Sequence, residues 1–491
     1  MFLRHSISDN AIRIVPGRNN FLHKFNVTFV LLDTDNQFSF MSEYIKIKRG
    51  LNIQLIGEAR KILSNLPLPE TFALKPDNFK GATLKLLVKE GDEVQAGTAL
   101  FADKSNEAIK FCSPVSGEVV EIIRGEKRKI LEVKILADRQ PNFTVFQKAD
   151  PHDLSREEII DALLASGVWP FIRQRPFGII ANPEEIPKSI FISAFDTNPL
   201  APDNDFILKD DMTDFQTGLD ALQKLTNGKV HLNINSDLTP VTVFANAGGV
   251  VINKISGPHP AGNVGVQIHH IDAISKGELV WYLYPQDVLI LGRLFNYGRF
   301  DASRVIALTG SQVMDQKYYK TIVGCTVKTI LADGGLKAGK SRIISGNVLT
   351  GKQISSEGFL DFYDSQITVI PEGVEPEFMG WLMPGFEKLS MSRTFFSWFK
   401  PNKKRGVNTN MHGEERPFVI TGEYEKVLPM DIYPVQLLKS ILIEDIEMME
   451  NLGIYEVVEE DFALCEFVCT SKIESQEIIR KGLELIRKEL S

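Results

Sequence analysis

The sequence predicts a multidomain chain of mixed α/β and α+β class, built from four folded modules. The chain has 491 residues, which is enough for about three or four domains of ordinary size. Hydrophobic residues make up 43% and charged residues 24%, the balance typical of globular proteins with buried cores. Along the chain, the apolar pattern changes from short strands to alternating strands and helices, back to strands, and finally to helices.

Residues 1–40 differ from the rest and are predicted to lie outside the folded modules. They do not contain a basic stretch followed by an apolar core and a small-residue cleavage site, so they are not interpreted as a secretory signal. Met41 then opens M-S-E-Y-I-K-I-K-R-G-L, which looks like a natural protein start. We therefore expect residues 1–40 to be a non-native extension, from a misassigned start codon or from cloning.

Residues 41–145 are predicted to form a barrel-sandwich hybrid domain, similar to lipoyl and biotinyl domains. A β-suited stretch at Leu84–Val88 precedes the turn Glu90-Gly91-Asp92, and a similar unit runs over residues 113–122. Glycines suit the corners of such hairpins because the backbone turns there with positive φ. Lys104 lies between the two hairpins, near the place where carrier domains hold a modified lysine. The connection is longer than in carriers, so we expect an unmodified, solvated side chain.

Residues 151–300 are predicted to form a Rossmann-like α/β domain. Ser155 and Glu158 have the spacing of a capping box, which predicts a helix that ends near Gly167. The elements predicted next are strand Ile190–Ser193, helix Phe215–Leu225 and strand Val241–Phe244. No G-x-G-x-x-G sequence follows a predicted strand, so the usual phosphate-binding turn is lacking and the domain is predicted to be degenerate.

Residues 301–374 are predicted to form a small β-grasp domain of SLBB-like type. Within it, residues 334–341 satisfy G-x-x-x-x-G-K-[ST], the phosphate-binding loop of nucleotide hydrolases. That chemistry needs a strand before the loop and a helix after it. A strand fits Val327–Leu331, but the sequence from Arg342 to Gly351 indicates strand and turns. The motif is therefore interpreted as a β-turn.

Residues 375–491 are predicted to form a mainly helical C-terminal domain. The last helix carries a stripe of four apolar residues at helical spacing: Ile479, Leu483, Ile486 and Leu490.

Composition and charge exclude several function classes. The net charge of −8 provides no domain-wide basic surface, so no nucleic-acid partner is expected. No apolar run approaches the ~18–20 residues that cross a bilayer. The four cysteines are too few to staple a chain of this length, which indicates a reducing compartment.

No metal site and no catalytic residue are predicted. Cys465 and Cys469 have the spacing of half a cluster site, but an iron–sulfur cluster usually takes four thiolates. His259, His269 and His270 do not have carboxylates at ligand spacing. The cysteines are therefore expected to be buried structural thiols.

Several blocks together resemble one family, the A subunits of the sodium-translocating NADH:quinone reductases. They occur in order along the chain: Phe79–Lys104, Ser113–Arg128, Ser166–Phe177, Ala194–Ala201, Ser256–Gly262, Gly380–Gly385, Tyr424–Asp431 and Ala463–Cys469. The chain departs from the family at Thr470, where a proline usually follows the second cysteine, and in carrying residues 1–40.

The resemblance implies a six-subunit membrane complex that oxidises NADH, reduces a quinone and exports sodium. It also implies kinship with one subunit of Rnf complexes and with the flavin-carrying subunit of respiratory complex I, although flavin glycines and cluster cysteines are missing here. This chain is therefore expected to be a peripheral subunit on the cytoplasmic face of the bacterial inner membrane, without a redox cofactor of its own. NADH, flavins, iron–sulfur and sodium would belong to the five partner subunits.

As a member of this family, the chain would contribute to quinone binding or to the docking of partner subunits. A quinone pocket needs apolar walls and a donor for each carbonyl oxygen. Phe171, Arg173 and Arg175 offer that mixture, as does His259. The alternative for the arginines is pairing with carboxylates at a domain or subunit surface.

Two other functions stay open at this stage. In one, the α/β domain itself binds FMN and NADH as a diaphorase. In the other, Lys104 is lipoylated or biotinylated and the chain is a carrier protein.

Overall fold

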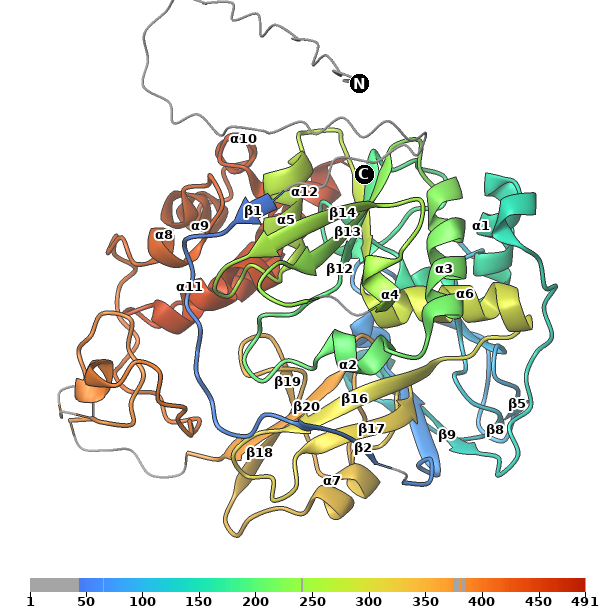
Figure 1. The fold of residues 1–491 in the computed structure, drawn as a ribbon, viewed down its shortest axis with the longest axis horizontal. Helices are drawn as coiled ribbons and strands as arrows, with labels where there is room; N and C mark the ends of the chain where they lie inside the picture. The colour runs from blue at the N-terminus through green and yellow to red at the C-terminus, as the bar shows by residue number, and fades with distance from the viewer. Residues whose placement is uncertain are drawn as a thin grey trace, which may run out of the picture. The chain divides into compact units, whose positions relative to one another are not determined.

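The computed structural model describes residues 44–490, except 65, 240–241, 374–378, 381–382 and 384. The predicted extension over residues 1–40 lies outside the described residues, as do Trp381, Leu382 and Pro384 of the Gly380–Gly385 block. The described strands form four sheets of seven, six, four and three strands. In Figure 1 the green strands β12–β14 lie side by side, and the yellow to orange strands β16–β20 form a separate sheet below them.

The first module is a pair of small sheets packed face to face. Its strands are β3 (Thr71–Leu74), β4 (Leu84–Leu86), β5 (Glu93–Val94), β6 (Ala99–Asp103), β7 (Lys110–Cys112), β8 (Gly117–Arg124) and β9 (Ile130–Ala137). The sheet orders are β3-β9-β8-β5 and β4-β6-β7, and buried Leu100 and Val119 belong to their shared core. At Gly117, a Cβ would lie 1.9 Å from the Leu136 carbonyl oxygen, so only glycine fits. The predicted turns at Gly91 and Gly117 are present with positive φ, but neither turn closes a hairpin of paired strands. The strands that flank each turn belong to different sheets, since β4 pairs with β6, β5 and β9 pair with β8, and β7 pairs with β6.

The second module is built on a seven-stranded sheet of order β1-β14-β13-β12-β15-β10-β11. Its bounds are β1 (Tyr44–Lys46), β10 (Arg173–Arg175), β11 (Ile179–Ile180), β12 (Ser189–Ser193), β13 (Lys229–Asn235), β14 (Val251–Ser256) and β15 (Val280–Leu283). The five strands from β1 to β15 run parallel, while β10 and β11 are antiparallel additions. Helices α1 (Arg156–Ser166), α2 (Asn204–Leu208), α3 (Met212–Lys224), α4 (Thr242–Ala245), α5 (Val264–Asp272) and α6 (Pro285–Tyr297) surround it.

Alternating side chains of β12 explain how helices cover both faces of this sheet. Ile190 and Ile192 belong to the large core shared with α3 and α6, whereas Phe191 packs with Val264 and Ile268 of α5. This is the period of two expected of a strand buried on both sides. The predicted capping box at α1 is also present, since the side chains of Ser155 and Glu158 each accept from the other's backbone, and Gly167 ends the helix with positive φ.

One predicted strand in this module is wrong. Val241–Phe244 was expected to be a strand because of its β-favouring residues, but the described part of it forms helix α4. Phe244 packs against Phe215 of α3 with ring centroids 5.5 Å apart, so tertiary packing outweighs local preference. The strands at this point of the fold are β13 and β14, which were not predicted because polar residues such as His231 and Asn233 interrupt their apolar pattern.

The first two described strands lie outside the barrel-sandwich sheets. β1 pairs in parallel with β14 of the second module, and β2 (Arg60–Ser64) pairs in parallel with β17 of the third. The range predicted for the first module, 41–145, therefore begins with a segment that completes two other sheets. Strands as short as these, with three and five residues, contain no sequence signal that identifies the distant strands with which they pair.

The third module is a six-stranded sheet of order β19-β18-β20-β16-β17-β2. Its own elements are β16 (Ser303–Thr309), β17 (Lys317–Ile322), α7 (Lys328–Gly334), β18 (Ser341–Ser345), β19 (Lys352–Ile354) and β20 (Gln366–Pro371). The strand expected at Val327–Leu331 is wrong, because α7 occupies this stretch. The strand expected after the loop is confirmed as β18. The motif thus runs helix, loop, strand, which is the reverse of a phosphate-binding loop.

The end of the chain packs around a second core. Its helices are α8 (Tyr424–Val427), α9 (Pro434–Leu442), α10 (Ile446–Asn451), α11 (Ala463–Val468) and α12 (Ser475–Leu490). Ile479, Leu483 and Ile486 of the predicted stripe are buried there, whereas Leu490 is exposed. Among the described residues, no helix combines the length and the apolar character that crossing a bilayer requires.

Candidate functional site

The parallel sheet creates a topological switch point, where ligands of α/β proteins usually bind. From β12 the chain adds β13 and then β14 on one side, and later returns to place β15 on the other. The carboxyl ends of β12 and β15 therefore lie side by side and lead into diverging loops. In open α/β sheets, the crevice outside such a pair of strand ends is the preferred ligand site.

A cleft of about 360 Å³ occupies this position, and all four modules contribute to its wall. The loop after β12 supplies Phe195, Asp196 and Asn198, and the loop after β15 supplies Tyr284–Asp287. The other charged or aromatic residues of the wall come from the surrounding modules: Asp77, Lys80, Arg173, Arg304, Lys352, Asp361, Tyr363, Asp364, Glu459 and Glu460.

Arg173 is the central cation of this cleft. Its guanidinium carbon lies 4.7 Å from the ring centre of Tyr282, 5.1 Å from that of Tyr284 and 4.5 Å from that of Tyr363. Such contacts stabilise a cation without using its N–H groups. The Nε and Nη2 atoms are buried and have no hydrogen-bond partner in the described residues. Buried donors are nearly always bonded, so two such donors without a partner mark this guanidinium as a candidate ligand contact.

The three tyrosines stay neutral around this cation. Burial raises the pKa values of Tyr282, Tyr284 and Tyr363, and this effect outweighs the opposing charge of Arg173. The cage therefore presents aromatic faces and protonated phenols beside a permanent positive charge. A second, smaller cavity of about 100 Å³ is also lined by Arg173, so this residue borders two cavities.

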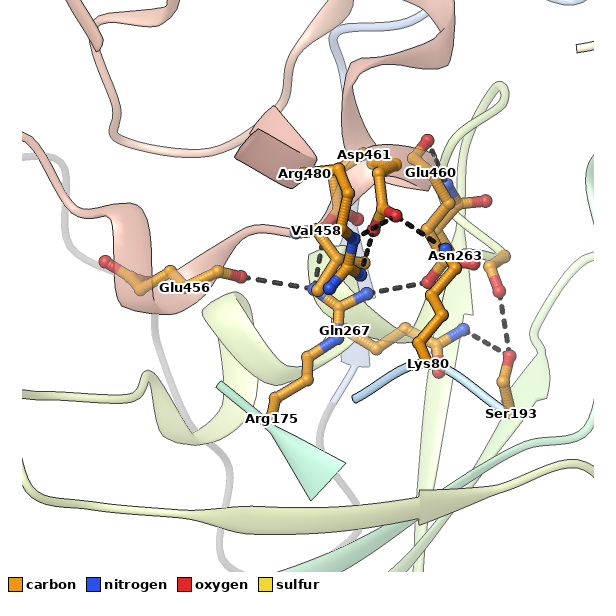
Figure 2. Close-up of polar contacts among 12 residues, drawn as sticks. Lys80, Arg175, Ser193, Asn263, Gln267, Glu456, Val458, Glu460, Asp461 and Arg480 are labelled. Atoms are coloured by element: carbon orange, nitrogen blue, oxygen red, sulfur yellow. Dashed lines mark hydrogen bonds and ion pairs between the residues drawn. The ribbon is translucent and has the colours of Figure 1, made fainter. Parts of the chain in front are cut away.

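Arg175, two residues along β10, has a different environment. It is fully buried, with Nη1 2.6 Å from Asp461 Oδ2 and Nη2 2.6 Å from Glu460 Oε1. Nη1 also donates to the Glu456 carbonyl oxygen at 3.2 Å. Figure 2 shows the guanidinium pointing into this acidic segment. Arg175 thus pairs with carboxylates of the C-terminal module, as the alternative interpretation of the arginines expected.

His259 lies behind the cleft wall. It is buried, and its Nδ1 is 3.1 Å from the hydroxyl of Thr197, which follows the cleft residue Asp196. Burial lowers the pKa of His259 to about 4, so the ring is neutral at pH 7. Its Nε2 atom is buried without a partner in the described residues.

Phe171 belongs to the core between modules. It is fully buried and stacks on Phe362 with ring centroids 4.6 Å apart. Of the four residues predicted for quinone binding, Arg173 lines the cleft and the other three do not. The residues that sequence reasoning missed, above all Tyr282 and Tyr284, mark the end of β15. The available signal was W-Y-L-Y-P at Trp281–Pro285, an apolar strand that ends in a tyrosine before a helix-starting proline.

Two carboxyl groups of the cleft, those of Asp287 and Asp364, hold their protons more tightly than usual. Burial raises the pKa of Asp287, which pairs with Arg304 at 2.6 Å. Burial and the nearby charge of Asp361 raise the pKa of Asp364 to about 6, against an opposing hydrogen bond from Ser345 at 2.5 Å. Asp364 therefore exchanges its proton close to neutral pH.

The wall does not suit a phosphate-bearing cofactor. Its charged residues are seven carboxylates and four cations, so a pyrophosphate or flavin phosphate would meet net repulsion. The loop after β12 reads A-F-D-T-N-P-L-A and contains no glycine to bring backbone N–H groups close to an anion. The loop after β12 therefore lacks the glycine-rich backbone that usually receives a dinucleotide phosphate.

The cysteines and Lys104 do not line the cleft. No group of three or more His, Cys, Asp or Glu residues in the part of the chain that is described could hold a metal ion. All four thiols are buried, and burial raises the pKa of Cys112 to about 12 and that of Cys325 to about 11. Lys104 is exposed and begins the connection from β6 to β7.

Three family descriptions match the chain in order. The NqrA N-terminal barrel-sandwich hybrid domain matches residues 45–138, the NqrA second alpha/beta domain residues 154–300, and the NQRA C-terminal domain, of SLBB type, residues 305–356. These descriptions agree with the barrel-sandwich, α/β and SLBB-like modules of the sequence prediction.

Similar proteins cover nearly the whole chain. The A subunit of the Na(+)-translocating NADH-quinone reductase of Photorhabdus laumondii is 39% identical over 448 residues, which are 91% of this chain and all of the relative. The corresponding protein of Yersinia pestis is 40% identical with the same coverage, and that of Rhodopirellula baltica is 38% identical over 90% of this chain and 98% of its own length. A solved NAD+-reducing [NiFe]-hydrogenase chain covers 70% of this chain and 63% of its own length, at 9% identity and a TM-score of 0.38, which is a weak likeness.

Proposed function

The chain belongs to the NqrA family, the A subunits of the Na+-translocating NADH-quinone reductases, and from this premise we propose that it is a peripheral subunit with a quinone site and no redox cofactor of its own. The complex to which the family belongs transfers electrons from NADH to quinone and translocates sodium. In this proposal NADH, flavins, iron–sulfur and sodium are held by the partner subunits, five in number, and the chain lies on the cytoplasmic face of the membrane.

The quinone site that we propose is the cleft at the switch point, with Arg173 as its main binding residue. A quinone headgroup is a neutral flat ring with two carbonyl oxygens, so it tolerates an acidic wall that a phosphate does not. The tyrosine cage offers aromatic surface, and the two unbonded N–H groups of Arg173 offer donors to one carbonyl oxygen. The single observation that supports this site best is that pair of buried, unpartnered donors.

Charge that develops on the quinone oxygen during reduction would be stabilised by the same guanidinium. Because such a cation is already held in place, little rearrangement is needed while the negative charge develops. Asp364 lines the same wall, and its pKa of about 6 lets it take up and release a proton near neutral pH, which suits the proton uptake that accompanies quinone reduction.

The proposal that this chain binds no redox cofactor rests on the chemistry of the residues that are present. The strand order around β12 is that of a dinucleotide-binding fold, but its first loop has an aspartate and a proline where glycines would cradle phosphate. We therefore describe the second module as a degenerate Rossmann-like domain. The proposed modules have the ranges 41–145, 151–300, 301–374 and 375–491, with a β-grasp type third module, and the strands β1 and β2 at the start of the first range complete sheets of the second and third modules.

Binding of a short-chain benzoquinone to the purified full chain tests the site. We expect hydrogen exchange of residues 171–175 and 282–287 to slow when the quinone is added. Arg173→Gln should weaken the quinone affinity at least about tenfold, because it removes a charge-assisted donor. Arg299→Gln is the matched control, since Arg299 lies over Phe143 at 4.6 Å and does not line the cleft. Equal affinity of the two variants, or no exchange protection in the wild type, would refute the site.

A further inference from the structure

Residues 386–405 form a surface loop of unusual composition. Four large aromatic side chains on this loop are exposed, with Phe386 at 65%, Phe399 at 63%, Phe396 at 44% and Trp398 at 43%. They form one cluster, because Phe396 contacts both Phe386 and Phe399, and Trp398 stacks on Phe399 with ring centroids 4.0 Å apart. We call these four residues the aromatic cluster. Contiguous exposed aromatic surface of this kind marks an interaction site.

The charge of the same loop is opposite to that of the whole chain. Residues 386–405 contain six Lys or Arg residues and one acidic residue, Glu387, which gives a formal charge of +5 in a chain whose net charge is −8. Lys403 pairs with Glu387, and Lys404 pairs with Glu58 at 2.7 Å. Arg393 and Lys400 are exposed and form no ion pair with a described residue. The cluster therefore sits within a local excess of positive charge.

A buried arginine holds this loop in place. Arg405 is only 2% exposed, and its guanidinium donates to the carbonyl oxygens of Ser397 and Lys400, both at 2.8 Å, as well as to those of Lys403 and Phe386. Its backbone joins the chain to the body of the protein, because Arg405 N–H donates to the Gln54 oxygen and the Arg405 oxygen accepts from Ile56. The aromatic residues thus face outward from a fixed backbone, so their exposure does not result from a loose loop.

We infer that this loop is a membrane-surface contact, in which the aromatic cluster enters the interfacial layer of an anionic bilayer and the surrounding Lys and Arg residues meet its headgroups. Tryptophan and phenylalanine beside lysine and arginine suit this layer, because the rings are apolar while the cations stay at the headgroup level. The exposed cations Arg393 and Lys400, which form no ion pair with a described residue, are complementary to an anionic leaflet. In Figure 1 this stretch is part of the orange segment at the left edge of the described unit. The inference is independent of the quinone site.

Sedimentation of the purified full chain with vesicles tests the contact. Vesicles of one part phosphatidylglycerol to two parts phosphatidylcholine should bind the chain at least about tenfold more than pure phosphatidylcholine vesicles, and raised salt should weaken the binding because it screens the charges. The double variant W398A/F399A and the charge variant R393E/K400E should each lose most of this binding. Their matched controls are Tyr433→Ala, which removes a 65% exposed ring elsewhere, and Lys89→Glu, which changes charge on the first module.

Two outcomes would overturn the inference. One is vesicle binding that is absent in the wild type or equal in the loop variants and their controls. The other outcome would come from hydrogen exchange of the assembled complex, purified in an uncharged detergent. If residues 386–405 are protected from hydrogen exchange there without any lipid, another protein of the complex covers the loop and it is not a lipid contact. Circular dichroism of each variant shows whether the fold is retained, and W398F/F399L repeats the test with a milder change.

Discussion

At the residue scale, Arg173 and Arg175 show what the sequence could and could not predict. Both were predicted because arginine beside aromatic and proline residues suits a quinone site, and nothing local distinguishes them. The structure places them in different settings on one strand, Arg173 among tyrosines beside the cleft and Arg175 against Glu460 and Asp461 of another module. Partners about 285 residues away decide which arginine is free to bind. No local pattern contains that information.

Asp364 provides a prediction for this scale. Its folded-state pKa is raised, so the stability that it contributes is fully present below its unfolded value and is lost as pH rises through about 6. Asp364→Asn removes the charge that burial penalises. We expect the variant to be more stable than the wild type by about 1–3 kcal/mol at pH 8, with the difference shrinking toward pH 4.

Urea unfolding of both proteins at several pH values measures this difference. Asp138→Asn, at an exposed surface aspartate, is the control and should follow the wild type. A stability gap that is independent of pH would show that Asp364 keeps an ordinary pKa.

At the scale of secondary-structure elements, the sequence predicted the elements whose signals are strong and local. The capping box at α1 and the turns at Gly91 and Gly117 are confirmed because their chemistry is complete within a few residues, whereas the pairing of the strands around these turns was not predicted correctly. Helix α4 and strands β13 and β14 were missed because their identity depends on packing against other elements. The order of the parallel strands, and with it the switch point, is a tertiary property. The cleft could therefore be located only after β15 was placed beside β12.

The contact between α3 and α6 fixes the cleft, since α6 begins in the loop after β15. The two helices approach at glycines: a Cβ on Gly292 would lie 1.7 Å from the Asp214 carbonyl oxygen, and one on Gly218 2.2 Å from that of Val288. Gly292→Ala should force the helices apart and lower the free energy of unfolding by about 1–3 kcal/mol or more.

Thermal unfolding checks this prediction against Gly248→Ala. The nearest atom to a Cβ at Gly248 is 3.6 Å away, so this control should be nearly neutral. Equal melting temperatures for the two variants would mean that the close helix contact is not required.

At the scale of the whole molecule, the acidic segment Val458–Asp461 joins separate modules. Glu459 pairs with Lys80 of the first module and with Arg480 of α12, each at 2.5 Å, while Glu460 and Asp461 hold Arg175 of the second. The cleft wall includes Lys80, Glu459 and Glu460, so this joint also shapes the candidate site. The sequence predicted the modules but not this joint, because its ion pairs connect residues far apart in the chain.

Glu459 gives a pH-dependent prediction for the joint. Burial opposes its ionisation, but the hydrogen bond to Arg480 and the charges of Lys80 and Arg480 outweigh burial and lower the pKa of Glu459 to about 2. The stability from this depressed pKa is present above the unfolded value and is lost as pH falls through about 2. Glu459→Gln should therefore cost about 2–3 kcal/mol at pH 7, and the cost should decline as pH falls below about 4.5.

Chemical denaturation of the wild type and of Glu459→Gln at several pH values from 7 to 3 measures how this loss of stability depends on pH. Glu477→Gln is a matched control on α12, where an exposed i,i+4 pair with Lys481 should contribute little. A constant cost over this range, or no cost at pH 7, would contradict the role assigned to Glu459.

The central claim is that this chain keeps the strand order of a redox fold while the cofactors belong to its partners. Native mass spectrometry of the complex, purified through a tag on this chain, tests that claim most directly. We predict that the chain, when released from the complex in the gas phase, has the mass of its polypeptide alone and that flavin stays with the other subunits. A released chain that carries one flavin, or a lipoyl or biotinyl group on Lys104, would contradict it.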